Sequence, residues 1–184
     1  MNEAELIKGC VSGNPRAQKQ LYDTFSGKMM GVCLRYCKSE EVAQDALQEG
    51  FVKVFSKLSE FKMDGSFEGW IRRIMVNTSL DILRKDKKHA FHADVDEVSF
   101  LLPDNETITG DLAAQELLKL LNTLPDGYRV VFNMFAIEGF SHKEIAEHLG
   151  VTENTSKSQY SRARAYLRDC IERLEQRENN SERH

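Results

Sequence analysis

Apolar residues recur every three or four positions along most of the chain, which is the spacing of one buried face of an α-helix. Only three prolines and few runs of β-branched residues compete with this pattern, so we predict an all-α protein. The predicted helices are 2–12, Pro15 to a break near Gly27, 29–37, 40–58, 67–86, 111–124, Pro125 to Gly139, 141–149, and a last helix that starts at Thr152 and frays after Leu174.

The stretch from residue 141 to residue 167 carries the signals of a helix, a tight turn and a second helix. Ser141 and Glu144 form an S-x-x-E capping box, which marks a helix start. Gly150 lies where that helix must end, a position that usually needs a left-handed backbone. Thr152 can then cap the second helix. This order predicts a helix-turn-helix motif.

The second helix of the motif combines an apolar stripe with a basic surface. Tyr160, Ala163 and Leu167 fall at i, i+3 and i+7, as a buried stripe requires. The remaining surface offers Lys157, Ser158, Ser161, Arg162, Arg164 and Arg168. Such side chains neutralise phosphates and contact base edges in a major groove. A solvated bundle helix has a similar composition, but the order of cap, turn and basic helix favours DNA binding.

A second basic surface is expected between residues 70 and 90. Six cations there face only two carboxylates; the cations are Arg72, Arg73, Arg84, Lys85, Lys87 and Lys88. Phe61, Phe67 and Trp70 lie beside them, and aromatic rings next to cations suit unstacked bases of a single strand. Burial of Trp70 in the core is an equally good interpretation.

The helix over 40–58 presents a different surface. It starts with acidic residues, and Asp45, Gln48 and Glu49 lie mainly off its apolar face. An acidic surface avoids DNA and can contact a protein. On these residues alone, a solvated face is the better interpretation.

The positions of the charged residues say more about function here than the net charge does. The net charge is −4, so DNA binding must depend on local basic surfaces. Of the four cysteines, Cys33 and Cys37 share a helix face, but no second pair completes a zinc site. We expect reduced, buried thiols and no cofactor. The sequence has no secretory or membrane-spanning segment, and we predict a soluble, cytoplasmic protein.

The stretch 91–116 divides the chain. It contains seven carboxylates and no lysine or arginine: Asp94, Asp96, Glu97, Asp104, Glu106, Asp111 and Glu116. We interpret it as an acidic linker between two small helical domains. The predicted boundaries are 1–90 for the first domain, 91–110 for the linker and 111–184 for the second, helix-turn-helix domain.

Three blocks, taken in order, resemble a bacterial RNA polymerase sigma factor. They are DALQEGFVKVFSKLSEF, FEGWIRRIMVNTSLDILRK, and LPDGYRVVFNMFAIEGFSHKEIAEHLGVTENTSKSQYSRARAYL. The short, two-domain form resembles the extracytoplasmic-function (ECF) group of the sigma-70 family. The resemblance covers about residues 8–175. It implies a subunit that directs polymerase to promoters by contacting their −10 and −35 elements in transcription initiation.

The resemblance assigns roles to residues of this chain. It implies that Asp45, Gln48, Glu49, Phe51 and Phe55 bind the β′ clamp coiled coil of core polymerase, which changes the interpretation of that polar face. It implies −10 contacts by Lys62, Met63, Asp64, Gly65, Ser66, Trp70, Arg73, Asn77, Arg84 and Lys85. It implies −35 contacts by Glu153, Asn154, Thr155, Lys157, Ser158, Ser161 and Arg162.

Further expectations follow from the family. The linker is expected to enter the polymerase channels, the β flap is a second contact on core, and an anti-sigma factor is an expected partner. No small-molecule substrate is expected. Members often have an aliphatic residue at the position of Ser156, so we expect looser packing there.

Two other functions compete with this interpretation. A stand-alone helix-turn-helix regulator would use only residues 141–168 and leaves the N-terminal half unexplained. An enzyme is disfavoured because the five histidines form no metal-binding pair, and no phosphate loop or nucleophile elbow occurs.

Overall fold

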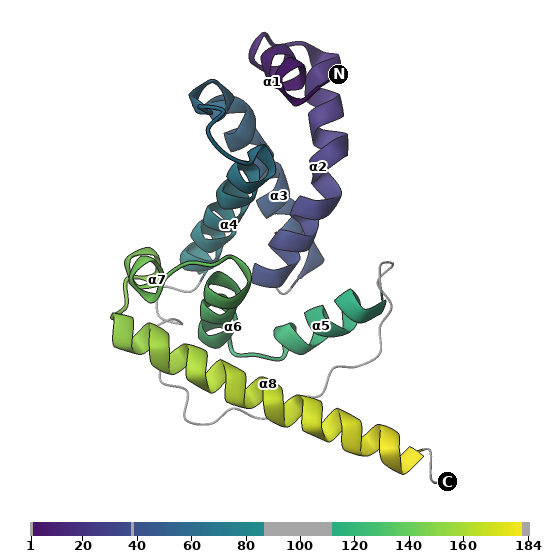
Figure 1. Cartoon of the computed structure of the whole chain (residues 1–184), viewed down its shortest axis with the longest axis vertical. Coiled ribbons are helices and arrows are strands. Elements are labelled where there is room, and N and C mark those ends of the chain that lie inside the picture. Colours follow the sequence, from purple (N-terminus) through teal and green to yellow (C-terminus); the bar gives the residue numbers. More distant parts are fainter. Residues whose placement is uncertain (1, 38, 87–111, 182–184) are drawn as a thin grey trace. The chain divides into compact units, whose positions relative to one another are not determined.

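The computed structural model describes residues 2–37, 39–86 and 112–181, and every regular element within these ranges is helical (Figure 1). Contacts divide the chain into two units, Met1–Lys87 and Lys88–His184. The predicted all-α class is therefore confirmed. Most of the acidic stretch interpreted as a linker lies outside the described residues.

The N-terminal unit consists of four helices and one turn of 3₁₀-helix. They are α1 (Glu3–Val11), α2 (Pro15–Tyr36), α3 (Glu40–Lys57), η1 (Leu58–Glu60) and α4 (Phe67–Asp86). Short polar side chains start these helices, because each satisfies backbone N–H groups that the first turn leaves free. Asn14 accepts from the backbone of Arg16 and Ala17, and Ser39 accepts from Val42.

The core of this unit lies where α2, α3 and α4 pack against one another. Its fully buried side chains include Leu21, Met29, Tyr36, Phe67, Ile71 and Met75. On α4, Ile74 and Ile82 are half-buried, whereas Val76 and Leu80 are buried beside Ile71 and Met75. Since α4 contacts both α2 and α3, its buried face is wider than one stripe.

The predicted break near Gly27 is wrong, because α2 runs unbroken from Pro15 to Tyr36. Leu21, Phe25 and Met29 are all buried on one face of it. Packing of that face stabilises the helix by more than the roughly 1 kcal/mol that a single glycine costs. Tertiary packing therefore overrides the local signal.

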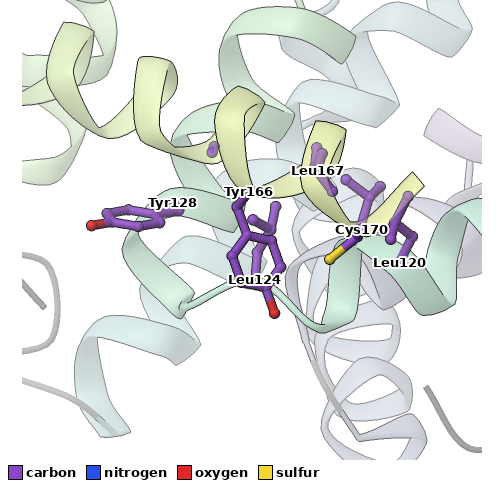
Figure 2. Packing of buried hydrophobic residues seen from close by; sticks show 8 residues of the cluster. Leu120, Leu124, Tyr128, Tyr166, Leu167 and Cys170 are labelled. Atoms are coloured by element: carbon purple, nitrogen blue, oxygen red, sulfur yellow. The ribbon is translucent and has the colours of Figure 1, made fainter. Parts of the chain in front are cut away.

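The C-terminal unit contains α5 (Leu112–Asn122), α6 (Asp126–Phe132), a five-residue π-helical segment η2 (Asn133–Ile137), α7 (His142–Leu149) and α8 (Glu153–Ser181). Its core joins α5 and α6 to α8 (Figure 2). Leu120, Leu124, Tyr128, Tyr166 and Cys170 belong to this cluster.

Helix α8 is longer than predicted. The tail after Leu174 was expected to fray, but the helix continues to Ser181. Glu, Gln and Arg dominate this tail, and all three are good helix formers. Among the described residues, no helix has the length and apolar character needed to cross a membrane.

Helices α1 and α2 lie close together at Gly9, and this contact gives a stability prediction. A Cβ added at Gly9 would lie 2.8 Å from the Cβ of Ala17, which is fixed to the backbone of α2. We expect Gly9→Ala to lower the free energy of unfolding by about 1–3 kcal/mol, because the two helices must separate. Urea unfolding followed by circular dichroism measures this.

Gly27 offers the matched control for that variant. It lies in the interior of α2, and a Cβ added there meets nothing within 4 Å. Gly27→Ala should therefore stabilise the protein by about 0.5–1 kcal/mol. If both variants unfolded at the same urea concentration, close helix contact would not limit the size of residue 9.

Candidate nucleic-acid interface

The helix-turn-helix is built by the local signals that predicted it. The Ser141 hydroxyl accepts from the Glu144 backbone at 3.2 Å, and Glu144 accepts from the Ser141 backbone at 2.8 Å, which completes the capping box. Gly150 ends α7 with φ 68°, a left-handed conformation that favours glycine. Thr152 then accepts from the Thr155 backbone at 3.0 Å and caps α8.

The residues predicted to contact a −35 element lie together at the start of α8. Six of the seven are exposed: Glu153, Asn154, Lys157, Ser158, Ser161 and Arg162. Thr155 is half-buried, and its hydroxyl lies 2.9 Å from that of Thr152. Ser156 and Gln159 are buried on the opposite side of the helix. The exposed set thus forms one continuous polar face.

Tyr160 differs from its prediction as part of a buried stripe. It is half-buried, and its ring contacts Phe132 and Phe135 at centroid distances of 5.9 and 4.6 Å. The guanidinium of Arg164 also lies over this ring, 5.8 Å from its centroid, where a cation is attracted to the π face. Tyr166 takes the buried place instead.

The expected loose packing at Ser156 is wrong. Ser156 is fully buried, and its Oγ lies 2.9 Å from Nδ1 of His142, the first residue of α7. The His142 ring in turn stacks on Phe135, with centroids 4.2 Å apart and planes inclined by 13°. A polar contact therefore lies where the family often has an aliphatic side chain, and no pattern along the chain predicted it.

Two cations of the predicted −35 face already have partners within the unit. Arg162 Nη1 donates to the hydroxyl of Tyr128 at 3.5 Å, across from α8 to α6. Lys157 Nζ lies 3.8 Å from the Glu153 carboxylate, one turn earlier on the same helix. The Lys157–Glu153 pair is solvent-exposed, where ion pairs are weak. The Arg162 contact is long and only partly buried. An anionic ligand can therefore compete with these partners for both cations.

The residues of the predicted −10 loop are exposed as a group. Lys62, Met63, Asp64, Gly65 and Ser66 all lie on the surface between η1 and α4. Met63 adopts φ 59°, a strained conformation for a residue other than glycine. The Ser66 hydroxyl accepts from the Gly69 backbone at 3.1 Å and anchors the end of the loop on α4.

Trp70 satisfies part of each interpretation given to it. Its ring packs against Phe61 and Phe67 at centroid distances of 5.4 and 5.9 Å, yet it is only half-buried. Arg73 and Lys85 on the same helix are exposed, and Asn77 is half-buried. The aromatic cluster therefore lies beside exposed cations. Lys87 and Lys88 lie outside the described residues.

The predicted polymerase-binding residues separate into exposed and buried members. Asp45 and Gln48 are exposed on α3, and Glu49 is half-buried. Phe51 is buried, with its ring centroid 4.7 Å from that of Tyr22 on α2. Phe55 is half-buried and lies next to Phe51, with centroids 6.2 Å apart. Phe51 therefore packs the core and is not a surface residue.

Lys53 was not predicted and connects α3 with α4. Its Nζ lies 2.8 Å from Glu49, 3.2 Å from the Thr78 hydroxyl and 3.6 Å from Asp81. The hydrogen bond from Lys53 lowers the pKa of the Glu49 carboxyl. Asp81 also lies 3.1 Å from Arg84, which links the acidic face of α3 to the basic face of α4. The Glu49–Lys53 spacing of four was the available sequence signal.

A groove of about 380 Å³ runs beside the same face of α3. Tyr22 and Met30 of α2 line it together with Gln44, Leu47 and Gln48 of α3. Its lining combines apolar and polar atoms and adjoins the exposed Gln48.

The four cysteines are free and buried. Burial raises the pKa of the Cys33 thiol to about 11, so it is a poor nucleophile and a poor metal ligand at neutral pH. Within the part of the chain that the structure describes, no group of three or more potential ligands could hold a metal ion.

Known families match both halves of the chain. Residues 21–89 match Sigma-70 region 2, and residues 114–167 match Sigma-70, region 4. The chain is 30% identical over 166 residues to the ECF RNA polymerase sigma factor SigM of Mycobacterium tuberculosis, covering 90% of this chain and 83% of that protein. It is 31% identical over 156 residues to the sigma factor SigE of Mycolicibacterium smegmatis, covering 83% of this chain and 60% of that protein.

Solved structures agree on the fold. The structure of CnrH in complex with the cytosolic domain of CnrY matches with a TM-score of 0.50 and 26% identity, covering 91% of this chain and 95% of that one. The sigma factor RpoE of Bartonella quintana, in complex with the anti-sigma factor NepR, matches with a TM-score of 0.54 and 24% identity over 84% of this chain and 96% of that one.

The match to region 2 accounts for the N-terminal unit, which a stand-alone helix-turn-helix regulator leaves unexplained. That alternative is therefore not favoured. The chain belongs to the sigma-70 family, as an ECF RNA polymerase sigma factor that directs the polymerase to promoters.

Proposed function

We propose that the two units divide promoter recognition between them, with residues 1–90 contacting core polymerase and the −10 element and residues 111–184 contacting the −35 element. The observation that carries this proposal is the presence of two separate basic surfaces, one on each unit. Residues 91–110 join them as an acidic tether. Because the net charge is −4, DNA must meet these local surfaces rather than the whole molecule.

The exposed face of α8 is proposed to lie in the major groove of the −35 duplex. Asn154, Ser158, Ser161 and Arg162 supply hydrogen-bonding groups for base edges, and Lys157 supplies a cation for phosphate. Thr155 takes part in the N-terminal cap of α8, so we propose that it stabilises the start of this helix rather than contacting a base. Glu153 can accept from a cytosine amino group.

The surface around the loop 62–66 is proposed to hold the melted −10 strand. A base that leaves the duplex loses its stacking on neighbouring bases. It regains stacking energy when it packs against an aromatic side chain. Trp70 is half-buried in its cluster and leaves part of the ring accessible for this. Arg73, Arg84 and Lys85 can then pair with the phosphates of the same strand, with Asn77 beside them. Arg84 would exchange its contact with Asp81 for one with a phosphate.

The acidic face of α3 is proposed to bind the β′ clamp of core polymerase. Asp45 and Gln48 are exposed for direct contact, and Glu49 is accessible through its pair with Lys53. Phe51 and Phe55 support this face from beneath by packing on Tyr22 and on each other. The adjoining groove between α2 and α3 offers room for a side chain of the clamp.

An anti-sigma factor is a further proposed partner, and the β flap is the proposed second contact on core. Two matched structures are complexes, one with the cytosolic domain of CnrY and one with the anti-sigma factor NepR. We also propose that the protein acts in the cytoplasm and has no catalytic activity of its own.

Transcription by reconstituted polymerase tests this function. Run-off transcription with purified core polymerase and a genomic library should give a small set of start sites that depend on this subunit. A gel shift with the protein alone should show little binding to the same promoters. Strong binding without core would favour a stand-alone regulator, and unselective initiation with core would reject the proposal.

Asn77→Ala tests the assignment of the −10 surface. Asn77 is half-buried on α4 among the proposed −10 residues. Its loss should reduce promoter opening about tenfold, on the order of the 1–3 kcal/mol that a base contact contributes. Permanganate footprinting measures opening, and native gels measure binding to core.

The binding measurement supplies the control for that variant. Binding to core polymerase should be unchanged, because Asn77 lies outside the proposed clamp-binding face of α3. An equal loss of opening and of core binding would count against the assignment.

A further inference from the structure

A polar contact fixes the corner of the helix-turn-helix, where most neighbours are apolar. Nδ1 of His142 at the start of α7 lies 2.9 Å from Oγ of Ser156 in the first turns of α8. Ser156 has no accessible surface. It therefore satisfies its hydroxyl within the protein, and the hydrogen bond to His142 is the contact it makes across the motif.

The π-helical segment η2 places a ring against the other side of His142. Phe135 lies in this segment, and its ring stacks on the imidazole with centroids 4.2 Å apart. The ring of Tyr160 on α8 also lies near the imidazole of His142, with ring centroids 5.9 Å apart. The imidazole is thus held in one orientation by packing and presents Nδ1 to Ser156.

Ser156 lies within the set of residues proposed to contact DNA. Thr155 precedes it, and Lys157 and Ser158 follow it. Since successive helical residues are about 100° apart, fixing Ser156 toward α7 fixes the direction in which its neighbours project. A small rotation of α8 about its own axis would move every base-contacting side chain together.

The protonation state of His142 matters for this contact. A neutral imidazole can accept from the Ser156 hydroxyl, whereas a doubly protonated ring can only donate and forces the hydroxyl to reorient. The charged groups of α8 that act on the ring are Lys157, which opposes a proton, and Glu153, which favours one. The segment η2 carries no charged side chain, and Glu144 of α7 is engaged with Ser141.

Burial and the nearby Lys157 together lower the pKa of His142 from its ordinary value of 6.5. The folded state therefore binds this proton more weakly than the unfolded state does. The contribution of neutral His142 to the free energy of unfolding is therefore complete above about pH 6.5. It is lost as the pH falls from there through the lowered pKa of the folded state. At neutral pH the ring is uncharged.

We propose that the hydrogen bond between neutral His142 and Ser156 is a positioning contact that sets the rotation of α8 on α7 and thereby the discrimination among −35 sequences. This inference rests on the proposed −35 function of α8. It assigns no base contact to either residue. It predicts that discrimination weakens as the pH falls far enough to protonate His142.

The test measures a ratio of affinities. Protonating His142 adds a cation, which strengthens attraction to any duplex, so binding to a single DNA would mislead. Holoenzyme affinity should be measured by fluorescence anisotropy for an upstream duplex from a selected promoter and for a scrambled duplex. The ratio is compared from about pH 7.5 down to the lowest pH at which circular dichroism shows the protein folded, because the pKa of His142 lies below its ordinary value.

Three variants separate positioning from simple packing. His142→Phe keeps the ring stack and removes the nitrogen, whereas Ser156→Ala removes the hydroxyl. Each variant should lower the ratio of specific to scrambled affinity about fivefold at neutral pH, because one hydrogen bond usually contributes about that much. His142→Asn places an amide near the position of Nδ1 without a titratable group. It should keep most of the ratio and remove its pH dependence.

His148 provides a control on the same helix. Its ring packs edge-on against Phe140 at 5.4 Å, away from Ser156. His148→Gln should give the wild-type ratio and the wild-type pH profile. Circular dichroism at both pH values checks that every variant is folded.

The inference is overturned if His142→Phe discriminates as well as the wild type, or if the wild type and His142→Asn have the same pH profile. Arg162→Ala separately tests whether the exposed face of α8 contacts the −35 element. If it loses discrimination while His142→Phe does not, only the positioning role fails. If Arg162→Ala also keeps full discrimination, the assignment of the α8 face itself fails.

Discussion

Replacing Asp126 by Ala is expected to lower the free energy of unfolding of the C-terminal unit by about 3 kcal/mol. Arg129 is buried, and its Nη2 lies 3.2 Å from the Asp126 carboxylate, one turn earlier on α6. The side chains of Arg129 and Asp126 are only 1% and 10% exposed. Removing the carboxylate leaves a buried guanidinium without its neighbouring counter-charge, and burial makes that charge expensive.

The paired variant Asp126→Ala, Arg129→Met is the control for this prediction. It removes the buried charge together with its partner and replaces the long stem by an adaptable apolar one. Replacing a buried ion pair by apolar residues is often close to neutral, so the double variant should recover most of the lost stability. If it were less stable than Asp126→Ala, Arg129 would stabilise the unit by other contacts.

A single tryptophan makes the measurement specific to one unit. Trp70 belongs to α4 of the N-terminal unit, so its fluorescence follows that unit in urea. Circular dichroism follows the helices of both units. The Asp126→Ala variant should lose helical signal at lower urea while the fluorescence transition stays in place. The prediction fails if neither transition moves.

Much of the fold followed from local sequence signals. Asn14, Ser39 and Ser141 each cap the helix that follows, as expected from short polar side chains at helix starts. Gly150 has the left-handed backbone that its place after α7 required. These features depend on a few consecutive residues, so one sequence is enough to predict them.

The departures all depend on contacts between distant residues. The continuity of α2 through Gly27 depends on a buried face that packs on other helices. Lys53 joins α3 to Asp81 of α4, and Ser156 joins α8 to His142 of α7. Helical periodicity says which residues share a face. It does not say which polar group on another helix faces them.

The same limit applies to the candidate sites. The −35 set is one exposed face because its residues are close in sequence on a single helix, which periodicity can predict. The set on α3 combined exposed Asp45 with buried Phe51 because both were inferred from the family. A family resemblance identifies a segment, whereas burial decides which of its side chains can touch a partner.

Removing two cations from α8 is expected to have the largest effect on promoter binding. Arg162→Ala should cost about 1–3 kcal/mol of affinity for the upstream duplex, and Lys157→Ala should weaken binding to all duplexes about equally. Both side chains are exposed on the proposed −35 face. The double variant should lose about 10- to 100-fold in affinity of the holoenzyme for an upstream duplex, measured by anisotropy.

Salt dependence separates the two contributions. Each lost phosphate contact lowers the slope of log affinity against log salt by about one. Lys157→Ala should show this change with little loss of sequence preference. Arg162→Ala should relax sequence preference if its guanidinium contacts a base, and change mainly the slope if it contacts phosphate.

Tyr128→Phe is the matched control, because it removes the hydroxyl that accepts from Arg162 at 3.5 Å and leaves the cation in place. The Arg162 guanidinium then has one competing partner fewer, so this variant should bind the upstream duplex at least as well as the wild type. If Tyr128→Phe lost as much affinity as Arg162→Ala, the hydrogen bond would orient the arginine for DNA rather than compete with it. If neither cation variant changed binding, the exposed face of α8 would not be the surface that meets the −35 element.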